Sequence, residues 1–192
     1  MTAFDYVTAM DPDGLRRDYP IGEAFPGALR GLSRDALRAR QERDFQRILA
    51  FAWKVPFYQR LWGAKGIEPG DIRTLDDLPK LPSYDKADIM ASVTAFPPLG
   101  DFHGQDAHPP GQRPQIIFHT TSGTTGKPQP LLFGPRSREV QNRLLARHYL
   151  MAGMTRDDVV HSVYGHGLIN GGHYVRETVQ HWVGARFMSA GT

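Results

Sequence analysis

The spacing of hydrophobic residues predicts helices over most of the first ninety residues. Residues 33–54 open with a serine suited to cap a helix, and their apolar residues recur every three or four positions. These are Leu37, Phe45, Ile48, Leu49 and Ala52. Pro56 ends this helix and suits the first position of a second, short one. Two more short helices are predicted, one begun by Thr74 and one over residues 84–91 with Ser83 as its cap.

A proline-rich stretch then interrupts the helical pattern. Residues 97–114 hold five prolines and three glycines with almost no apolar periodicity, which predicts a long connecting loop. Short apolar runs at residues 116–118 and 131–133 lie on either side of a glycine-rich segment, and they predict two strands around a tight loop. The chain therefore divides into a helical region over residues 1–96, the loop, and a third region over residues 115–192.

The third region continues as helix, strand, helix and strand. A helix is predicted to begin at Ser137, and its apolar face would carry Val140, Leu144, His148 and Ala152. A buried strand over residues 159–163, a helix stopped by Gly184 and a strand over residues 185–188 follow. Alternating strands and helices predict an α/β fold layered around a mostly parallel sheet. The fold class is thus a helical leader followed by the first part of an α/β domain with an incomplete sheet.

Composition excludes several classes of protein. The 192 residues include no cysteine, so disulfide frameworks, thiolate zinc sites, iron–sulfur clusters and cysteine nucleophiles are excluded. The first residues are acidic where a signal peptide would be basic, and no stretch approaches the roughly 20 apolar residues of a membrane span. Basic residues are densest between residues 34 and 54, where acidic residues alternate with them, which favours a solvated helix face over nucleic-acid binding. We therefore expect a cytoplasmic protein with neither a membrane nor a nucleic acid as partner.

The segment HTTSGTTGKP, residues 119–128, is the strongest chemical signal. Its glycines let the backbone turn and approach a ligand, its hydroxyl and amide groups donate to phosphate oxygens, and Lys127 neutralises negative charge. The segment differs from a Walker A loop because only two residues separate Gly123 from Gly126, and because Pro128 follows the lysine where a magnesium-binding hydroxyl would stand. The residues indicate a phosphate-binding loop, and a polar hairpin turn is the plainer alternative.

TTSGTTGKP resembles the phosphate-binding loop of the adenylate-forming superfamily, which includes acyl-CoA synthetases, peptide-synthetase adenylation domains and luciferases. Within the superfamily, VPFYQRLWGAKGIEPGDIRTLDDLPKLPSYDKADI and HSVYGHGLINGG are similar to segments of phenylacetate–CoA ligases, in the same order. The likeness runs from about residue 35 to the end of the chain.

The resemblance implies an AMP-forming acid–thiol ligase. ATP and a carboxylic acid would give an acyl-adenylate and pyrophosphate, and the thiol of coenzyme A would then displace AMP; Mg²⁺ is expected with the ATP. The phosphates would be held by Thr121, Ser122, Gly123, Thr124, Thr125, Gly126 and Lys127. By analogy the resemblance also implies a homodimer.

A second candidate site lies at the end of the predicted strand over residues 159–163, where α/β sheets place ligands. By the resemblance this segment would form the acyl pocket, with Tyr164, Gly165, His166, Ile169 and Gly171 as its residues. Ile169 stands where family members often have phenylalanine, so an aryl or related small acid is expected rather than phenylacetate itself. A glycine-rich connector is the plainer alternative.

Eight histidines suggest a metal site, but their spacing matches no common ligand motif and no metal is expected. His119 and His166 are candidates for positioning the loop or contacting substrate. The resemblance places the adenine-binding segment and a catalytic lysine beyond residue 192, so we expect an N-terminal portion that is inactive by itself. The alternative function is a non-catalytic nucleotide- or phosphate-binding module.

Overall fold

Residues 5–123 and 126–191 are described by the computed structural model, and they form two compact units. Unit 1 combines residues 1–30 with residues 114–192, and unit 2 comprises residues 31–113. Residues 5–30 thus pack with the C-terminal part of the chain, although the sequence grouped them with the helical region that follows.

Unit 2 is built from α4 (Arg34–Ala52), α5 (Pro56–Gly63), α6 (Lys86–Ala95) and 3-10 turns at Leu75–Lys80, Gly104–Ala107 and Pro110–Gln112. The predicted caps of α4 and of the first 3-10 turn are confirmed, since Ser33 accepts a hydrogen bond from the Ala36 amide and Thr74 heads a capping box. Ser83 does not cap α6. Asp85 does so, because its carboxylate accepts from the first free amides of the helix.

The hydrophobic core of unit 2 consists of two neighbouring groups. Leu49 packs with Trp62 and Ile72, and Val55 packs with Phe57 and Ile89. The predicted apolar face of α4 is only partly buried, because the Ile48 side chain is 63% exposed. Leu37 is also exposed.

The proline-rich segment contributes a buried charge to unit 2, which the sequence did not suggest. Asp101 is only 6% exposed, and both of its carboxylate oxygens lie 2.8 Å from Nη2 of Arg60. Ser92 donates its hydroxyl to Asp101 Oδ1 at 2.7 Å and accepts the Asp101 amide at 2.9 Å. The segment is therefore fixed to α5 and α6 rather than being a free connecting loop.

Replacing Ser92 by alanine should destabilise unit 2 by about 1–3 kcal/mol, because it leaves the buried Asp101 amide and one carboxylate site without a partner. Hydrogen exchange of the α6 amides under increasing urea measures this loss. Ser83→Ala is the matched control, and it should leave exchange unchanged because Ser83 does not cap the helix. Equal exchange in Ser92→Ala and the native chain would contradict the prediction.

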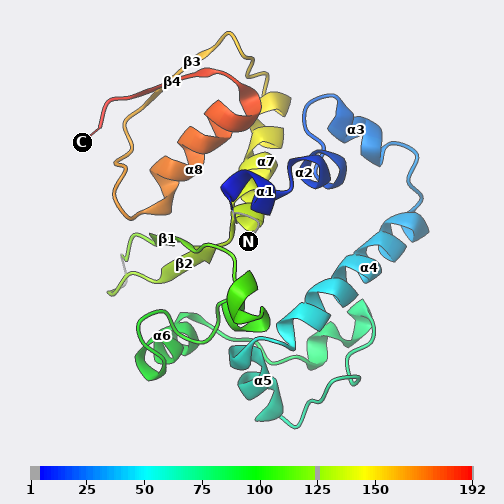
Figure 1. Cartoon of the computed structure of the whole chain (residues 1–192). Coiled ribbons are helices and arrows are strands. Elements are labelled where there is room, and N and C mark those ends of the chain that lie inside the picture. The colour runs from blue at the N-terminus through cyan, green and yellow to red at the C-terminus, as the bar shows by residue number, and fades with distance from the viewer. Residues whose placement is uncertain (1–4, 124–125, 192) are drawn as a thin grey trace. The chain divides into compact units, whose positions relative to one another are not determined.

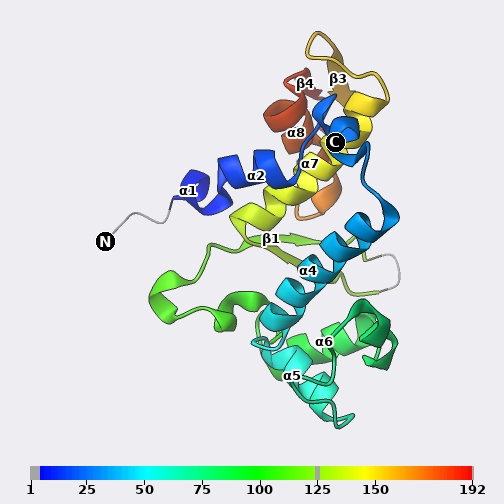
Figure 2. The ribbon, with the colours of Figure 1, turned by 90° about the vertical axis from the view of Figure 1, so that its right-hand side faces the viewer.

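Unit 1 is centred on α7 (Pro135–Met151). The helices α1 (Tyr6–Met10) and α2 (Pro12–Asp18) contact one side of it, and α8 (Asn170–Thr178) contacts another, as both views show (Figure 1 and Figure 2). A short helix, α3, covers Ala24–Leu29, and a π-helical turn at Val179–Val183 continues α8 until Gly184 ends it as predicted. The apolar core of unit 1 contains Ala146, Val179, Val183 and Ala185.

The prediction for the buried face of α7 is wrong. The helix begins at Pro135 after Gly134, and Ser137 accepts the Gly134 amide from the third position rather than heading the helix. Leu144 is 46% exposed, whereas the buried positions are mostly polar. They are Pro135, Arg138, Glu139, Asn142, Arg143 and Ala146. The polar side chains are buried because they bond one another and groups of α1, α2 and α8, as described below.

Unit 1 contains two strand pairs (Figure 1). β1 (Ile117–Thr120) pairs antiparallel with β2 (Pro130–Phe133), as predicted around the tight loop. β3 (Val159–Ser162) pairs parallel with β4 (Arg186–Ser189). A mostly parallel sheet is thus not formed by these strands, although the α/β class is confirmed.

The prediction of a buried strand over residues 159–163 is also wrong. Val163 is 71% exposed and Val159 is exposed as well, because among the described residues β4 alone pairs with β3. Within residues 5–123 and 126–191, no helix is long and apolar enough to cross a membrane.

Candidate functional site

The predicted phosphate loop connects the two antiparallel strands of unit 1. Its base is closed by two hydrogen bonds, one from the Thr121 amide to the Gln129 carbonyl at 3.0 Å and one from the Gln129 amide to Thr121 Oγ1 at 3.0 Å. Ser122 and Lys127 are exposed. Two of the predicted phosphate ligands, Thr124 and Thr125, lie outside the described residues.

Backbone geometry shows why glycine is needed at position 123. Its φ is +73°, a left-handed conformation that residues with a side chain rarely adopt. A Cβ there would lie 2.9 Å from Pro128 Cγ and 3.0 Å from the Gly126 carbonyl oxygen. Gly126 has φ +124° but has open space around it, so its requirement is conformational alone. The loop is thus tightly closed on itself at Gly123 and open at Gly126.

The structure brings the predicted acyl-pocket segment against this loop. The Thr120 amide donates to the Leu168 carbonyl at 2.8 Å, and Thr120 and Ile169 form a parallel β-bridge. The two segments lie more than forty residues apart in sequence and are joined at the end of β1 (Figure 1). Tyr164 and Ile169 are exposed at this junction.

The glycines of the pocket segment differ in what they allow. A Cβ at Gly172 would lie 2.5 Å from the Gly165 carbonyl oxygen, so close approach of the backbone requires glycine there. A Cβ at Gly171 would lie 3.7 Å from the Tyr164 ring, an ordinary contact distance, and a Cβ at Gly167 would meet open space. Of these three glycines, Gly172 in the first turn of α8 is therefore the one at which a side chain would collide with the backbone.

Three histidines meet beside the junction. The His173 ring lies 4.7 Å from the His119 ring and 5.4 Å from the His166 ring. His166 Nδ1 lies 3.1 Å from the Ser189 hydroxyl. Burial lowers the pKa of His119, and the positive charge of Arg138 lowers it further. His119 is thus held neutral near pH 7, in a group that the sequence did not bring together.

Polar side chains of α7 form a largely buried cluster with residues of α8 and the turn that follows it, and this cluster supports the same junction. The α7 cluster, as we call it, consists of Arg138, Glu139, Asn142, Glu177 and His181. Arg138 Nε donates to Glu177 at 2.5 Å, and its Nη1 donates to Asn170 directly after the pocket segment. The guanidinium also lies over the Phe133 ring of β2. Arg138 therefore links the strand that follows the phosphate loop to the helix that follows the pocket.

Glu139 is the acceptor at the centre of the α7 cluster. It accepts from the Tyr6 hydroxyl and the Trp182 indole at 2.7 Å each, from Asn142 at 3.2 Å, and it pairs with His181 at 3.2 Å. Burial raises the pKa of this carboxyl, but the hydrogen bonds from His181, Tyr6, Trp182 and Asn142 outweigh burial and lower the pKa to about 2. The hydrogen bond between Glu139 and His181 raises the pKa of His181.

Sequence reasoning missed His173 and the α7 cluster as site residues. Their signal was an α7 segment in which polar residues recur at helical spacing, as at Arg138 and Asn142, while its apolar residues form no continuous stripe. Such a pattern is ordinarily that of an exposed helix, and only the partners on other helices reveal the burial. Among the described residues, no three acidic or histidine side chains are grouped so as to hold a metal ion.

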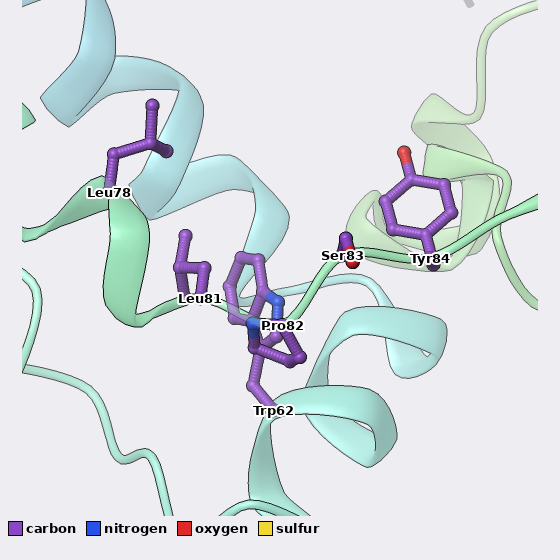
Figure 3. A pocket seen from close by; sticks show the side chains of 6 residues that line it. All are labelled: Trp62, Leu78, Leu81, Pro82, Ser83 and Tyr84. Atoms are coloured by element: carbon purple, nitrogen blue, oxygen red, sulfur yellow. The ribbon is translucent and has the colours of Figure 1, made fainter.

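Unit 2 has an open hollow of about 400 Å³ (Figure 3). Figure 3 shows the Trp62 indole beside Leu81 and Pro82, with Tyr84 further along the same segment. Leu78 and Ser83 complete its lining, so it contains no charged group. The hollow carries no chemistry comparable to that of the phosphate loop.

Comparison with known proteins gives consistent relatives. The sequence is 35% identical over 145 residues to a phenylacetate-coenzyme A ligase of Thermus thermophilus, covering 75% of this chain and 30% of that protein. It is 33% identical over 165 residues to the ligase of the same name from Aromatoleum evansii, covering 82% and 35%. The corresponding Escherichia coli ligase is 34% identical over 149 residues. No protein-family model matches the sequence.

Solved structures give the same result. A crystal structure of 2-hydroxyisobutyryl-CoA ligase in the postadenylation state with 2-HIB-AMP aligns with a TM-score of 0.64 and 26% identity, over 77% of this chain and 30% of that one. The ligase with 2-HIB-AMP and CoA in the thioesterification state aligns with a TM-score of 0.67, over 80% and 32%. The chain therefore spans about a third of the length of the relatives it matches.

Proposed function

We propose, from the premise that this chain belongs to the adenylate-forming family of acid–CoA ligases, that it supplies the phosphate loop and part of the acyl pocket of such a ligase. The single observation that carries the proposal is the junction at Thr120, where the phosphate loop and the pocket segment meet. The carboxylate must lie beside the α-phosphate of ATP in the first step of this reaction, and contact between the two segments supports the proposal that they bind these two groups.

The proposed reaction has two steps. A carboxylate oxygen attacks the α-phosphorus of ATP, which forms an acyl-adenylate and releases pyrophosphate. The thiol of coenzyme A then forms a thioester, and AMP leaves. Activation is needed because a free carboxylate would have to expel an oxide, whereas the mixed anhydride expels AMP. Mg²⁺ would neutralise charge on the phosphates, and the proposed use of ATP and coenzyme A agrees with a cytoplasmic location.

The loop is proposed to stabilise charge on the departing pyrophosphate. Backbone amides around Gly123, the hydroxyls of the loop and the exposed Lys127 ammonium are suited to phosphate oxygens. In full, the proposed phosphate ligands are Thr121, Ser122, Gly123, Thr124, Thr125, Gly126 and Lys127. For the acyl group, the exposed Tyr164 and Ile169 side chains beside the junction favour an aryl or other small carboxylic acid.

Calorimetric titration of the chain with Mg²⁺–pyrophosphate and with Mg²⁺–ATP tests the proposal. Lys127→Ala should weaken both by about 10- to 100-fold, because a charge-assisted hydrogen bond contributes about 1.5–3 kcal/mol. Lys65→Ala, an exposed lysine of unit 2, is the matched control and should change neither. A native chain that binds neither ligand, or a Lys127→Ala chain that binds as the native one does, would overturn the proposal.

A non-catalytic nucleotide- or phosphate-binding module is the second candidate, favoured by the presence of the phosphate loop in a chain that spans about a third of its relatives. Acid-dependent exchange of pyrophosphate into ATP separates the two. Exchange that depends on an added aryl or small acid supports the ligase, and phosphate binding that is indifferent to every acid, with no exchange in the full protein, supports the module.

A further inference from the structure

His173 lies in the first turn of α8, and its imidazole contacts the backbone of the pocket segment. Its Nε2 is 3.1 Å from the His166 carbonyl oxygen and 2.8 Å from the Gly167 carbonyl oxygen. Both partners are acceptors, so Nε2 carries the hydrogen and donates it to them. Nδ1 is then free to accept from Arg176 Nη2, which lies 3.5 Å away.

The next carbonyl along the pocket segment accepts its hydrogen bond from a different element. The Leu168 carbonyl accepts the Thr120 amide, which belongs to the strand that leads into the phosphate loop. Three consecutive carbonyls, those of residues 166, 167 and 168, are thus bonded by α8 and by β1. The His119 ring, one residue before Thr120, packs on the His173 ring. His173 therefore contacts both segments of the proposed site.

The held stretch lies between the two side chains proposed to face the acyl group. Tyr164 precedes it, Ile169 follows it, and both are exposed. The stretch also includes Gly167, whose surroundings are open and whose backbone has no side chain to restrict it. The hydrogen bonds to the carbonyls of residues 166–168 consequently restrict the conformation of this stretch, and the donor from α8 is the His173 imidazole.

We propose that His173 is a positioning residue for the acyl pocket, which fixes the backbone of residues 166–168 so that Tyr164 and Ile169 are held in place beside the phosphate loop. This inference rests on the proposed function. It assigns His173 to binding of the acyl part of the substrate and not to binding of the phosphates, because its donated hydrogen bonds go to the pocket segment. The acyl group contacts Tyr164 and Ile169, and His173 acts through the backbone.

Two amide substitutions test the assignment. Glutamine places a donor nitrogen close to the position of Nε2, whereas asparagine ends near Nδ1 and falls short of the two carbonyls. His173→Leu removes the donor entirely. The probes are Mg²⁺–pyrophosphate, which reports on the phosphate loop, and a phenylacetyl sulfamoyl adenosine, an unreactive acyl-adenylate mimic that has no pyrophosphate and reports on the acyl pocket. Thermal unfolding of each variant measures folding separately.

His173→Leu and His173→Asn should bind the acyl-adenylate mimic about tenfold more weakly than the native chain, a loss of the size expected for one hydrogen-bonding group. Both should bind pyrophosphate as the native chain does, and His173→Gln should recover most of the affinity for the mimic. Should His173→Leu fail to fold, the Asn and Gln pair carries the comparison. Native affinity for the mimic in His173→Asn, or parallel loss of both probes in all three variants, would overturn the inference. A native chain that binds neither probe overturns the proposed function itself.

Discussion

Replacing Arg138 by methionine is expected to destabilise unit 1 by about 3–5 kcal/mol, because it removes the main ion-pair partner of the largely buried Glu177 carboxylate. The Arg138 side chain is fully buried at 0% exposure, and Glu177 lies 2.5 Å from its Nε. Methionine fills much of the volume and retains contact with the Phe133 ring. The expected loss therefore arises from the carboxylate of Glu177 and the amide of Asn170, which no longer have the guanidinium as a donor.

The matched control lies two residues away on the same helix. Arg136 forms ion pairs with Asp11 and Asp18 that are partly exposed to solvent, so Arg136→Met should cost only about 0–1 kcal/mol. Urea-dependent hydrogen exchange of the α7 amides reports on unit 1 by itself. Equal destabilisation by the two substitutions would show that burial of Arg138 contributes nothing beyond an exposed pair.

A double substitution separates charge from volume. Arg138→Met combined with Glu177→Leu removes both charges, and it should recover part of the stability lost in Arg138→Met alone. If the double variant is less stable than Arg138→Met by the full cost of another buried substitution, the buried charge of Glu177 is not the cause of the loss.

Local chemistry made the tight loop between β1 and β2 predictable from sequence. Its glycines lie in a short polar segment between two apolar runs, and the strands on either side form as expected. At Gly123 the reason is visible in the backbone, since a Cβ would collide with Pro128 and with the Gly126 carbonyl. Other features set by neighbours in sequence were also correct at the cap at Ser33 and the stop at Gly184, whereas the starts predicted at Ser83 and Ser137 were displaced by two residues.

Burial was predicted poorly because it depends on partners distant in sequence. The polar face of α7 is buried only because Tyr6, Trp182 and Glu177 supply hydrogen bonds from other helices. Periodicity alone assigns such a face to solvent, so the buried face was predicted on the opposite side of the helix. The strand at Val159 shows the reverse error, since its valines were assigned to the interior although Val159 and Val163 are exposed.

The juxtaposition of the two site segments was likewise beyond the sequence. Each was recognisable from its own residues, but their junction is a single amide-to-carbonyl bond and a β-bridge at Thr120. His173 has the character of an ordinary helical residue until the carbonyls of residues 166 and 167 are placed beside it. The residues that align a site are thus harder to find than those that carry its chemistry.

Glu139→Ala is expected to destabilise unit 1 by about 3–5 kcal/mol as well. The carboxylate accepts hydrogen bonds from Tyr6, Trp182 and Asn142 and pairs with His181, so alanine leaves several donors without an acceptor and opens a cavity. Urea-dependent exchange of the α7 amides measures the loss at pH 7. A change below about 1 kcal/mol would contradict the central place of Glu139 in the α7 cluster.

The pH dependence of unit 1 gives a sharper test, because three groups act in different ranges. The pKa of Glu139 is lowered to about 2, so its contribution to stability is present above pH 4.5 and is lost as the pH falls toward 2. The pKa of His181 is raised, so its contribution is full below pH 6.5 and is lost as the pH rises through the raised value. The pKa of His119 is lowered by burial, so unit 1 loses stability as the pH falls below 6.5 and the unfolded chain binds the proton first.

Glu139→Ala should remove the first two dependences and keep the third. Without the carboxylate, the pKa of His181 is no longer raised by its partner, so the decline in stability as the pH rises above 6.5 is removed and the loss below pH 4.5 becomes smaller. The decline just below pH 6.5 persists, because burial of His119 next to Arg138 does not involve Glu139. His119→Phe should show the opposite pattern, with the decline below pH 6.5 removed and the decline above pH 6.5 retained. Urea titrations at intervals between pH 3 and pH 9 distinguish these profiles, and an unchanged decline above pH 6.5 in Glu139→Ala would show that the pair with His181 does not contribute to stability.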